Sequence, residues 1–457
     1  MKRIISFVLA MAVCFGLAAC KKPTDESVEE GVQTLRVTVG NSDEEIMLNS
    51  RLQKAFVAKK EKEGVKVKFL APSTFTTGTY QQSLSGLEAS NTLGDIIYTY
   101  DDKSGTNVAG EVFETLDEII EADSDFDMSK YDKTIIDSAR TYGGKIAYMP
   151  RSFDQITLFI NVSLFKKIGL ENEVPTKAKY GDNWENWTWD ACLELLAEIR
   201  TALDTKYGKS SKNYYPLAAD LFWNPVYNCI VRSFGGNCVD VGNMDTGFNP
   251  ENPAYAQTVK AFDFMNKLVS EKYSPAGQGQ FTNGFEAMWI GTRPSVTGVV
   301  SDGKIEVAFA PLPKFTDSIT GLTDTETFVS FGSSGYALNS NSKNKTLAWE
   351  FIKFTASEEG QKIIASAGSC VPIISSLLTA DGDWTKVEGL ENVDQSAFIF
   401  RGNTLIPATY ARGINIKNEF AVYTDSKNEI ANNLGKTTDA AVIVKKLYDA
   451  TKAYIKK

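Results

Sequence analysis

The residue types that carry most enzyme chemistry are scarce in this chain. None of its 457 residues is histidine, which excludes Ser-His-Asp and Cys-His nucleophiles, His-ligated zinc and histidine acid–base catalysis. The six cysteines form no C-x-x-C pair, which argues against a zinc knuckle or a thioredoxin-type redox site. Any enzymatic interpretation must therefore rest on carboxylates, lysines or tyrosines.

Short motifs that could bind phosphate or acylate a serine are incomplete. Gly-Lys-Ser at 208–210 and Gly-Lys-Thr at 435–437 lack the first glycine of a Walker motif, because Leu203 and Ile430 occupy that position. The S-x-x-K spacing occurs, but its S-D-N and K-T-G companions are missing. Acidic pairs are plentiful, so a glycosidase that uses two carboxylates stays open as an alternative.

Cys20 stands at the end of an apolar N-terminal run. The chain opens Met-Lys-Arg, and residues 4–19 are apolar with one serine, which is typical of a secretory signal and too short for a membrane span. Leu-Ala-Ala-Cys at 17–20 matches the bacterial lipobox, in which the cysteine is acylated, whereas Cys14 would leave with the signal. Residues 21–31 are charged and poor in apolar side chains, so we expect a flexible tether. An ordinary signal peptide with a chance cysteine is the alternative.

Composition bounds the function further. The chain is long enough for two or three domains, and 43% hydrophobic residues suffice for packed cores. The formal net charge of −9 argues against nucleic-acid binding, which needs a basic face, and against adhesion to anionic lipid by charge alone. Outside the cytosol Cys229 and Cys238 could form a disulfide. Equally, with Cys192 and Cys370, they could be buried free thiols.

Strand and helix patterns alternate in the first part of the chain. Residues 35–39, 65–69 and 95–98 are predicted strands. Helical patterns lie between them, one capped by Ser42 ahead of an acidic first turn and one over 80–89. This order predicts an α/β sheet with crossover helices.

Beyond residue 150 the pattern changes. Residues 155–160 form a long β-rich run. A helix is predicted to start after Thr188 as its cap, with apolar residues on one face, and further helices are predicted near 254–271 and 346–354. No internal repeat is present in the sequence.

Longer blocks resemble, in the same order, the family 1 extracellular solute-binding proteins of ABC importers. "GGKIAYMPRSFDQITLFINVSLFKKIGL" at 143–170 resembles the family's turn, strand and helix, with the aromatic residue shifted by one place. "WTWDACLELLAEIR" at 187–200, "FTNGFEAMWIG" at 281–291 and "GSCVPI" at 368–373 resemble its later blocks. The resemblance covers residues 34–375 and is loose beyond them.

The resemblance implies an α/β fold of the type II periplasmic-binding-protein class, with two hinge-linked lobes around a central ligand cleft. Strands are expected to cross between the lobes near 153–161 and 327–335. The implied division is a signal peptide at 1–19, a lipidated tether at 20–33, lobe 1 at 34–156 and 329–372, and lobe 2 at 157–328 and 373–457.

The resemblance also implies a function. A monomer held to the outer side of a bacterial membrane by lipid on Cys20 would capture a small solute by hinge closure. It would deliver the solute to the permease subunits of an ABC importer, without a cofactor, a metal or a catalytic residue. The rival interpretations are a cell-surface glycosidase and an interaction lipoprotein with this fold but no transport role.

Block by block, the resemblance places candidate ligand-binding residues at strand ends, where such sheets form their pockets. Their aromatic rings, carboxylates, amides and guanidinium groups suit a sugar. The candidates are Asn41, Thr99, Tyr100, Asp101, Asp102, Arg151, Asp154, Trp223, Asn224, Trp289, Thr292 and Arg293. Alternatives stay open for some of them: Trp289 could be a core residue, and Arg151 and Arg293 could equally form surface ion pairs. Trp384 lies where the resemblance fades and could have a site role or none.

Overall fold

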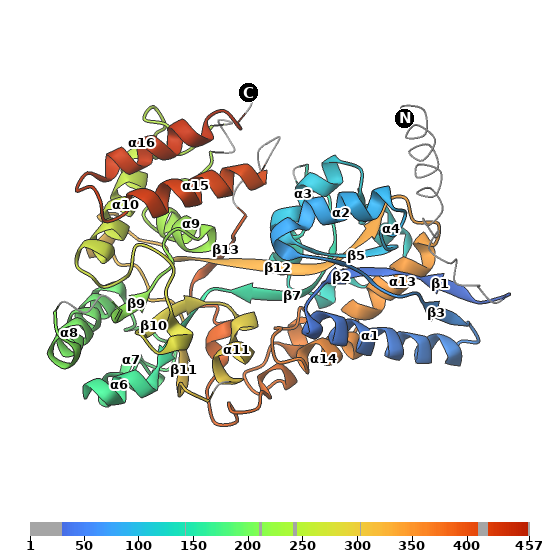
Figure 1. Ribbon diagram of the computed structural model, residues 1–457, viewed down its shortest axis with the longest axis horizontal. Coiled ribbons are helices and arrows are strands. Elements are labelled where there is room, and N and C mark those ends of the chain that lie inside the picture. Colours follow the sequence, from blue (N-terminus) through green and yellow to red (C-terminus); the bar gives the residue numbers. More distant parts are fainter. Residues whose placement is uncertain are drawn as a thin grey trace, which may run out of the picture.

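The structure is a computed structural model, and it describes residues 30–455 except 142, 210–212, 241–244, 302 and 410–418. Cys14 and Cys20 lie outside the described residues. The protein is a mixed α/β molecule with two lobes, which Figure 1 shows side by side. Within the described part of the chain, no helix is both long and apolar enough to cross a membrane.

The first lobe is built on a seven-stranded sheet. Its main strand order is β13-β12-β5-β2-β4, and β6 and β7 also pair with β12. Helices α2, α3 and α4 lie on one side of this sheet and α1 and α14 on the other (Figure 1). The strands are β2 (Val37–Gly40), β4 (Ser73–Phe75), β5 (Ile96–Tyr100), β6 (Phe113–Glu114), β7 (Met149–Gln155), β12 (Phe328–Asn339) and β13 (Thr404–Pro407), with β1 (Gln33–Leu35) and β3 (Val67–Phe69) paired apart. The helices are α1 (Asp43–Lys62), α2 (Tyr80–Ala89), α3 (Asp101–Ala109), α4 (Asp117–Ala122), α5 (Lys133–Ser138), α13 (Lys345–Ala356) and α14 (Glu358–Ala365).

The second lobe is built on a four-stranded sheet in the order β11-β8-β10-β9. Strand β8 is antiparallel to both β10 and β11, and β9 is parallel to β10. The strands are β8 (Thr157–Asn161), β9 (Tyr215–Ala218), β10 (Glu286–Gly291) and β11 (Val307–Ala310). The helices are α6 (Val162–Ile168), α7 (Lys177–Tyr180), α8 (Trp189–Tyr207), α9 (Asn224–Ser233), α10 (Tyr255–Ser270), α11 (Val296–Ser301), α12 (Asp317–Thr320), α15 (Glu419–Asn433) and α16 (Ala440–Thr451).

Local sequence signals place several of these elements where they were predicted. The Ser42 hydroxyl accepts a hydrogen bond from the Glu45 amide at 3.3 Å and caps α1. Thr188 caps α8 in the same way through the Ala191 amide, also at 3.3 Å. The strand predicted at 95–98 runs two residues further than expected, because β5 continues to Tyr100 and α3 begins at Asp101. Residues 99–102 therefore do not form the loop that would follow a strand ending at Tyr98.

Three strands pass between the lobes. Strand β7 belongs to the first sheet and β8 to the second, so the chain crosses at Ile156. The long strand β12 runs back beside β7 in antiparallel register and spans both lobes in Figure 1. Both crossings were expected. The third strand, β13, pairs in parallel with the start of β12 and was not. The residue boundaries of the lobes stay a prediction.

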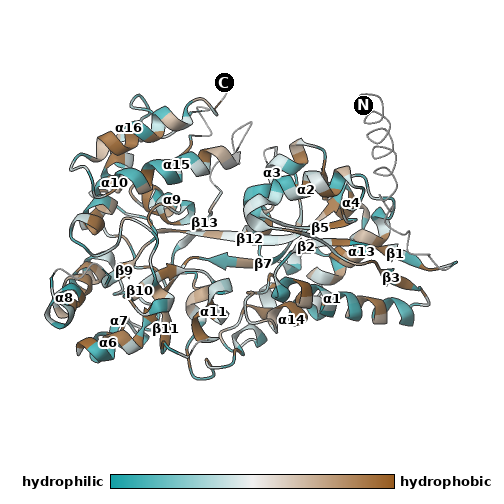
Figure 2. Ribbon diagram, viewed as in Figure 1, coloured by the Kyte–Doolittle hydropathy of each residue, from teal (hydrophilic) through white to brown (hydrophobic). Residues whose placement is uncertain are grey.

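The crossing strands are polar for buried β-structure. Figure 2 shows β7 largely hydrophilic and the middle of β12 pale. Ser333 and Ser334 are buried there, and their hydroxyls are satisfied by partners. The Ser333 hydroxyl lies 2.5 Å from the Tyr148 hydroxyl, and the Ser334 hydroxyl lies 3.0 Å from that of Ser152. The Ser152–Ser334 pair joins the two crossing strands, and the Tyr148–Ser333 pair joins β12 to the residue before β7.

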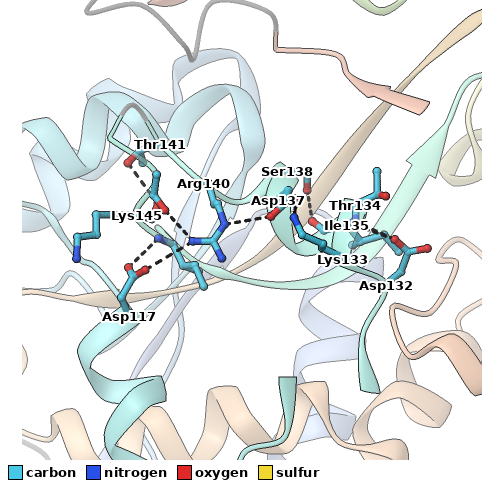
Figure 3. A network of polar contacts seen from close by, with 12 residues as sticks. Asp117, Asp132, Lys133, Thr134, Ile135, Asp137, Ser138, Arg140, Thr141 and Lys145 are labelled. Atoms are coloured by element: carbon cyan, nitrogen blue, oxygen red, sulfur yellow. Dashed lines mark hydrogen bonds and ion pairs between the residues drawn. The ribbon is translucent and has the colours of Figure 1, made fainter. Parts of the chain in front are cut away.

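A polar network fixes the segment that leads into β7 (Figure 3). The Arg140 guanidinium donates to the Asp137 carboxylate at 3.1 Å and to the Gly144 carbonyl at 2.7 Å. The Asp117 carboxylate accepts the Ile146 amide at 2.9 Å and lies 3.7 Å from Arg140. The turn before the first crossing is therefore held at its start by the Arg140–Asp137 bond and at its end by the bond from the Ile146 amide to Asp117.

The described cysteines are all free and buried. Cys229 and Cys238, for which a disulfide or free thiols were both possible, are free thiols in the structure. Burial raises the pKa of the Cys229 thiol to about 12, and it also raises the pKa of Cys192, Cys238 and Cys370. Thiols with such pKa values are poor nucleophiles at neutral pH.

Gly335 marks the closest approach of the two crossing strands, at a bulge in β12. A Cβ atom there would lie 2.0 Å from the Met149 carbonyl oxygen and 2.7 Å from the Pro150 Cα. We expect Gly335→Ala to push the strands apart and to lower the free energy of unfolding by about 1–3 kcal/mol, measured by urea denaturation.

Gly332→Ala is the matched control for this prediction. It lies three residues earlier in the same strand, and the nearest atom to its added Cβ, an Asp101 carboxylate oxygen, is 3.6 Å away. Its stability should stay within about 0.5 kcal/mol of the wild type. Equal urea midpoints for the two variants would contradict the proposed constraint at Gly335.

Candidate ligand-binding cleft

A cavity of about 380 Å³ lies between the lobes, and we call it the cleft. The first lobe contributes the start of α1 (Ser42, Glu44, Glu45), the end of β5 and start of α3 (Tyr98, Tyr100, Asp101, Asp102), and parts of β7 and β12 (Arg151, Ser152, Asp154, Gly332, Ser333, Ser334). The second lobe and the segments beside it contribute Trp223, Asn224, Pro225, Thr292, Pro294, Ala408 and Thr409, and Ile156, Ser369 and Cys370 complete the lining. The charged side chains of the lining belong to the first lobe's wall, which also carries the Tyr98 and Tyr100 rings and several serine hydroxyls. The second lobe presents the Trp223 ring, the Asn224 amide and threonine hydroxyls.

Most of the residues that the sequence nominated meet in this cleft. They come from segments far apart in the chain, and strand ends bring them together. The residues of the nominated set that line the cleft are Tyr100, Asp101, Asp102, Arg151, Asp154, Trp223, Asn224 and Thr292.

Asn41 and Thr99 do not line the cleft. Thr99 is fully buried in β5. Side chains alternate along a strand, so Tyr98 and Tyr100 face the cleft while Thr99 points the other way. Asn41 is exposed, and its amide donates to the Thr76 hydroxyl at 3.4 Å.

Trp289 does not line the cleft either, in line with the core alternative. Its ring packs on Phe159 and Phe281, with centroid distances of 5.0 and 5.7 Å. Its indole nitrogen donates to an Asp220 carboxylate oxygen at 3.1 Å. Trp289 is half-buried. Trp384 is fully buried, and its indole nitrogen donates to the Thr379 carbonyl at 2.9 Å.

Arg293 is fully buried behind the cleft. It donates to the Gly368 carbonyl at 2.9 Å, to the Trp384 carbonyl at 2.5 Å, and to the Gln395 side chain. Burial lowers the pKa of Arg293 to about 10, and the Asp154 carboxylate opposes that shift. Arg293 therefore links the separate segments that contain Gly368, Trp384 and Gln395.

Arg151 forms an ion pair, but the pair is buried inside the cleft wall and does not lie on the surface as expected. Its two terminal nitrogens bind both carboxylate oxygens of Glu45, one of them at 2.9 Å. It also donates to the Tyr336 hydroxyl at 3.2 Å, and its guanidinium lies 4.0 Å from the centre of the Tyr98 ring. Burial alone would lower the pKa of Arg151, but Glu45 raises it well above the usual value. The charge of Arg151 is thus satisfied within the protein.

Sequence reasoning missed Glu45. It lies in the first turn of α1, immediately after strand β2. The available signal was that an acidic helix start follows a strand end, which is where such sheets form their pockets. The serines of β12 were missed because β12 was treated only as a crossing.

Asp154 lies in β7 opposite Gly332 and faces the cleft. Burial raises the pKa of its carboxyl group to about 7, opposed by Arg151 and Arg293 and reinforced by Asp101. Its Oδ1 atom is buried and accepts no hydrogen bond from the described residues. A ligand hydroxyl could supply the missing donor.

Comparison with known proteins gives one family match and several similar structures. The family described as bacterial extracellular solute-binding protein matches residues 48–362. An ABC substrate-binding protein from Listeria monocytogenes in complex with cycloalternan is 18% identical, with a TM-score of 0.67, over 92% of this chain and 98% of that chain. The GacH receptor of Streptomyces glaucescens, solved unliganded and with acarbose, is 18% identical with a TM-score of 0.65, over 93% and 98%. A sugar transporter from Rhizobium etli in an open conformation is 20% identical with a TM-score of 0.67, over 92% and 99%. At these identities the likeness shows the two-lobed fold alone.

Proposed function

The chain belongs to the bacterial extracellular solute-binding protein family, and on that premise we propose that it captures a sugar or oligosaccharide and delivers it to the permease of an ABC importer. The family and the similar structures are substrate-binding proteins, so the chain is a binding protein and not an enzyme. The rival glycosidase interpretation is thereby set aside. Capture proceeds by closure of the two lobes about the crossing strands.

The observation that carries the carbohydrate proposal is the presence, in one cleft, of an indole ring from the second lobe and three aspartate carboxylates from the first. Trp223 on the second lobe offers an indole face for the apolar C–H groups of a sugar ring. Asp101, Asp102 and Asp154 on the first lobe offer oxygens that accept hydrogen bonds from hydroxyls. Cycloalternan, acarbose and maltotetraose in the similar structures support the same ligand class.

The test is a ligand screen of protein that starts after Cys20. Ligand at about 100 times its dissociation constant adds roughly 2.7 kcal/mol of stability, which raises the melting temperature by a few degrees. We expect such a shift with one or more mono- or oligosaccharides, recovered chemically unchanged after long incubation. If no sugar in the screen raises the melting temperature, the carbohydrate proposal is wrong. If a sugar is cleaved during the incubation, the glycosidase interpretation holds instead.

Asp102 should contribute to ligand affinity. It lies on the cleft wall in the first turn of α3, with Lys103 2.7 Å from its carboxylate. Loss of a hydrogen bond that involves a charged group costs about 1.5–3 kcal/mol. Asp102→Ala should therefore weaken binding by an order of magnitude or more, measured by calorimetric titration with a sugar from the screen. Asp381→Ala, at an exposed acidic residue that does not line the cleft, is the control. Equal affinities for the two variants would show that Asp102 does not bind the ligand.

We also propose that Cys20 carries the lipid that holds the protein at the membrane. The Leu-Ala-Ala-Cys sequence at 17–20 supports this proposal. Cys20→Ala should abolish incorporation of a fatty-acid probe in growing cells, and Cys14→Ala, the matched control, should not. Unchanged labelling of the Cys20 variant would show that Cys20 does not carry the lipid anchor.

A transport role separates this proposal from an interaction lipoprotein of the same fold. Cells that lack the protein should lose uptake of the sugar identified in the screen. Uptake at the wild-type rate would favour the interaction lipoprotein.

A further inference from the structure

The turn between β9 and α9 presents Trp223 to the cleft. Asp220 opens this turn with φ of 47°, a left-handed conformation that aspartate tolerates better than most residues. The Trp223 amide donates to the Asp220 carbonyl at 2.8 Å, and Trp223 then caps α9. The direction of the Trp223 ring therefore depends on how Asp220 is held.

The Asp220 side chain ties the turn to two other segments of the second lobe. One carboxylate oxygen accepts the Trp289 indole N–H at 3.1 Å, and the other accepts the Gly279 amide at 3.1 Å. The loop at Gly279 lies so close to β9 that a Cβ there would be 2.3 Å from the Cβ of Ala218. Trp289 is itself fixed by the sheet and by the rings packed on it.

A second anchor lies on the other side of Trp223. The Asn224 amide donates to the Ala408 carbonyl at 3.1 Å, directly after the crossing strand β13. Trp223 thus faces the cleft between two anchored residues, Asp220 and Asn224, of which Asn224 also lines the cleft.

We propose that Asp220 and Trp289 are positioning residues for the ligand, acting through Trp223 by the indole–carboxylate hydrogen bond. The proposal rests on the carbohydrate-binding function proposed above. Neither residue lines the cleft. A ring already held in its binding orientation saves the entropy that ordering it would cost, so loss of the hydrogen bond should lower affinity about tenfold.

Trp289→Phe tests this because it keeps an aromatic ring beside Phe159 and Phe281. It lacks the indole N–H and the second ring of the indole, and the control below loses the same atoms. In protein labelled with 5-fluorotryptophan, the 19F resonance of Trp223 is assigned by its loss in Trp223→Phe. We expect that resonance to shift or broaden in Trp289→Phe and in Asp220→Asn, and sugar affinity to fall with it. Asp220→Asn also serves if Trp289→Phe does not fold.

Trp349→Phe is the matched control. Trp349 makes the same type of bond, from its indole nitrogen to the Asp123 carboxylate at 2.8 Å, but in the first lobe. Its loss should leave both the Trp223 resonance and the affinity unchanged.

The outcomes are distinguishable from failure of the carbohydrate proposal. An unmoved Trp223 resonance in both Trp289→Phe and Asp220→Asn overturns the positioning role whether or not a sugar is known. A moved resonance with unchanged sugar affinity overturns it as well. If the wild type binds no sugar, the carbohydrate proposal fails, and the 19F spectrum still decides whether the pair holds Trp223.

Discussion

Replacing Arg293 with methionine should lower the free energy of unfolding by about 3–5 kcal/mol, a large part of the stability of a typical protein. The substitution keeps much of the side-chain length and removes every donor. The Gly368 and Trp384 carbonyls and the Gln395 side chain would each lose a buried partner. A buried acceptor without its donor costs about 1–3 kcal/mol. Urea denaturation gives the size of the loss.

Arg51→Met is the matched control. With the described residues, Arg51 makes a single exposed hydrogen bond, to the Ser366 hydroxyl at 3.3 Å, so its loss should cost less than about 0.5 kcal/mol. An Arg293 variant as stable as the Arg51 variant would show that Arg293 does not fasten these segments. It would also reopen the interpretation of Arg293 as a residue that contacts ligand.

Asp154→Asn should change how stability depends on pH. The folded protein raises the pKa of Asp154 from its ordinary value of 3.8 to about 7, chiefly by burial. The folded state therefore holds this proton more tightly than the unfolded state does. The resulting stability is complete below about pH 4 and is lost as the pH rises through 7.

Neutral asparagine at 154 avoids this loss. Three pKa units correspond to about 4 kcal/mol, so the variant should be more stable than the wild type at pH 8 by up to about that amount. At pH 4 the two should be equal. Glu286, whose pKa burial also raises to about 7, keeps some pH dependence in the variant.

Asp127→Asn is the control for the pH experiment. Hydrogen bonds from Ser129 hold the pKa of Asp127 below its usual value, so the change should not alter the slope between pH 4.5 and 7. Parallel stability curves for wild type and Asp154→Asn would show that burial does not perturb the Asp154 carboxyl group as described.

Features encoded by neighbouring residues could be predicted from the sequence. The caps at Ser42 and Thr188 need only the next three residues, and both predictions are confirmed. The crossing near 153–161 was implied by the resemblance of residues 143–170 to the family, and the chain crosses at Ile156. Strand β13 has only four residues and too little pattern to be recognised.

Features set by distant contacts could not be predicted. Whether Thr99 or Tyr100 faces the cleft depends on the register of β5 against β12, which the local sequence does not encode. Arg293 is buried by Gly368, Trp384 and Gln395, all more than seventy residues away along the chain. The local sequence therefore indicates a ligand contact or a surface ion pair for Arg293, and the structure shows neither.

The buried thiols provide intrinsic reporters of opening. Cys370 lies on the cleft wall, whereas Cys192, Cys229 and Cys238 lie in the core of the second lobe. A maleimide can reach these sulfur atoms only when the protein around them opens. The rate of its reaction with Cys370 would report how fast the cleft opens. Its slower reaction with the other three cysteines would report how fast the second lobe unfolds. Mass spectrometry of the unsubstituted protein would give both rates in one experiment.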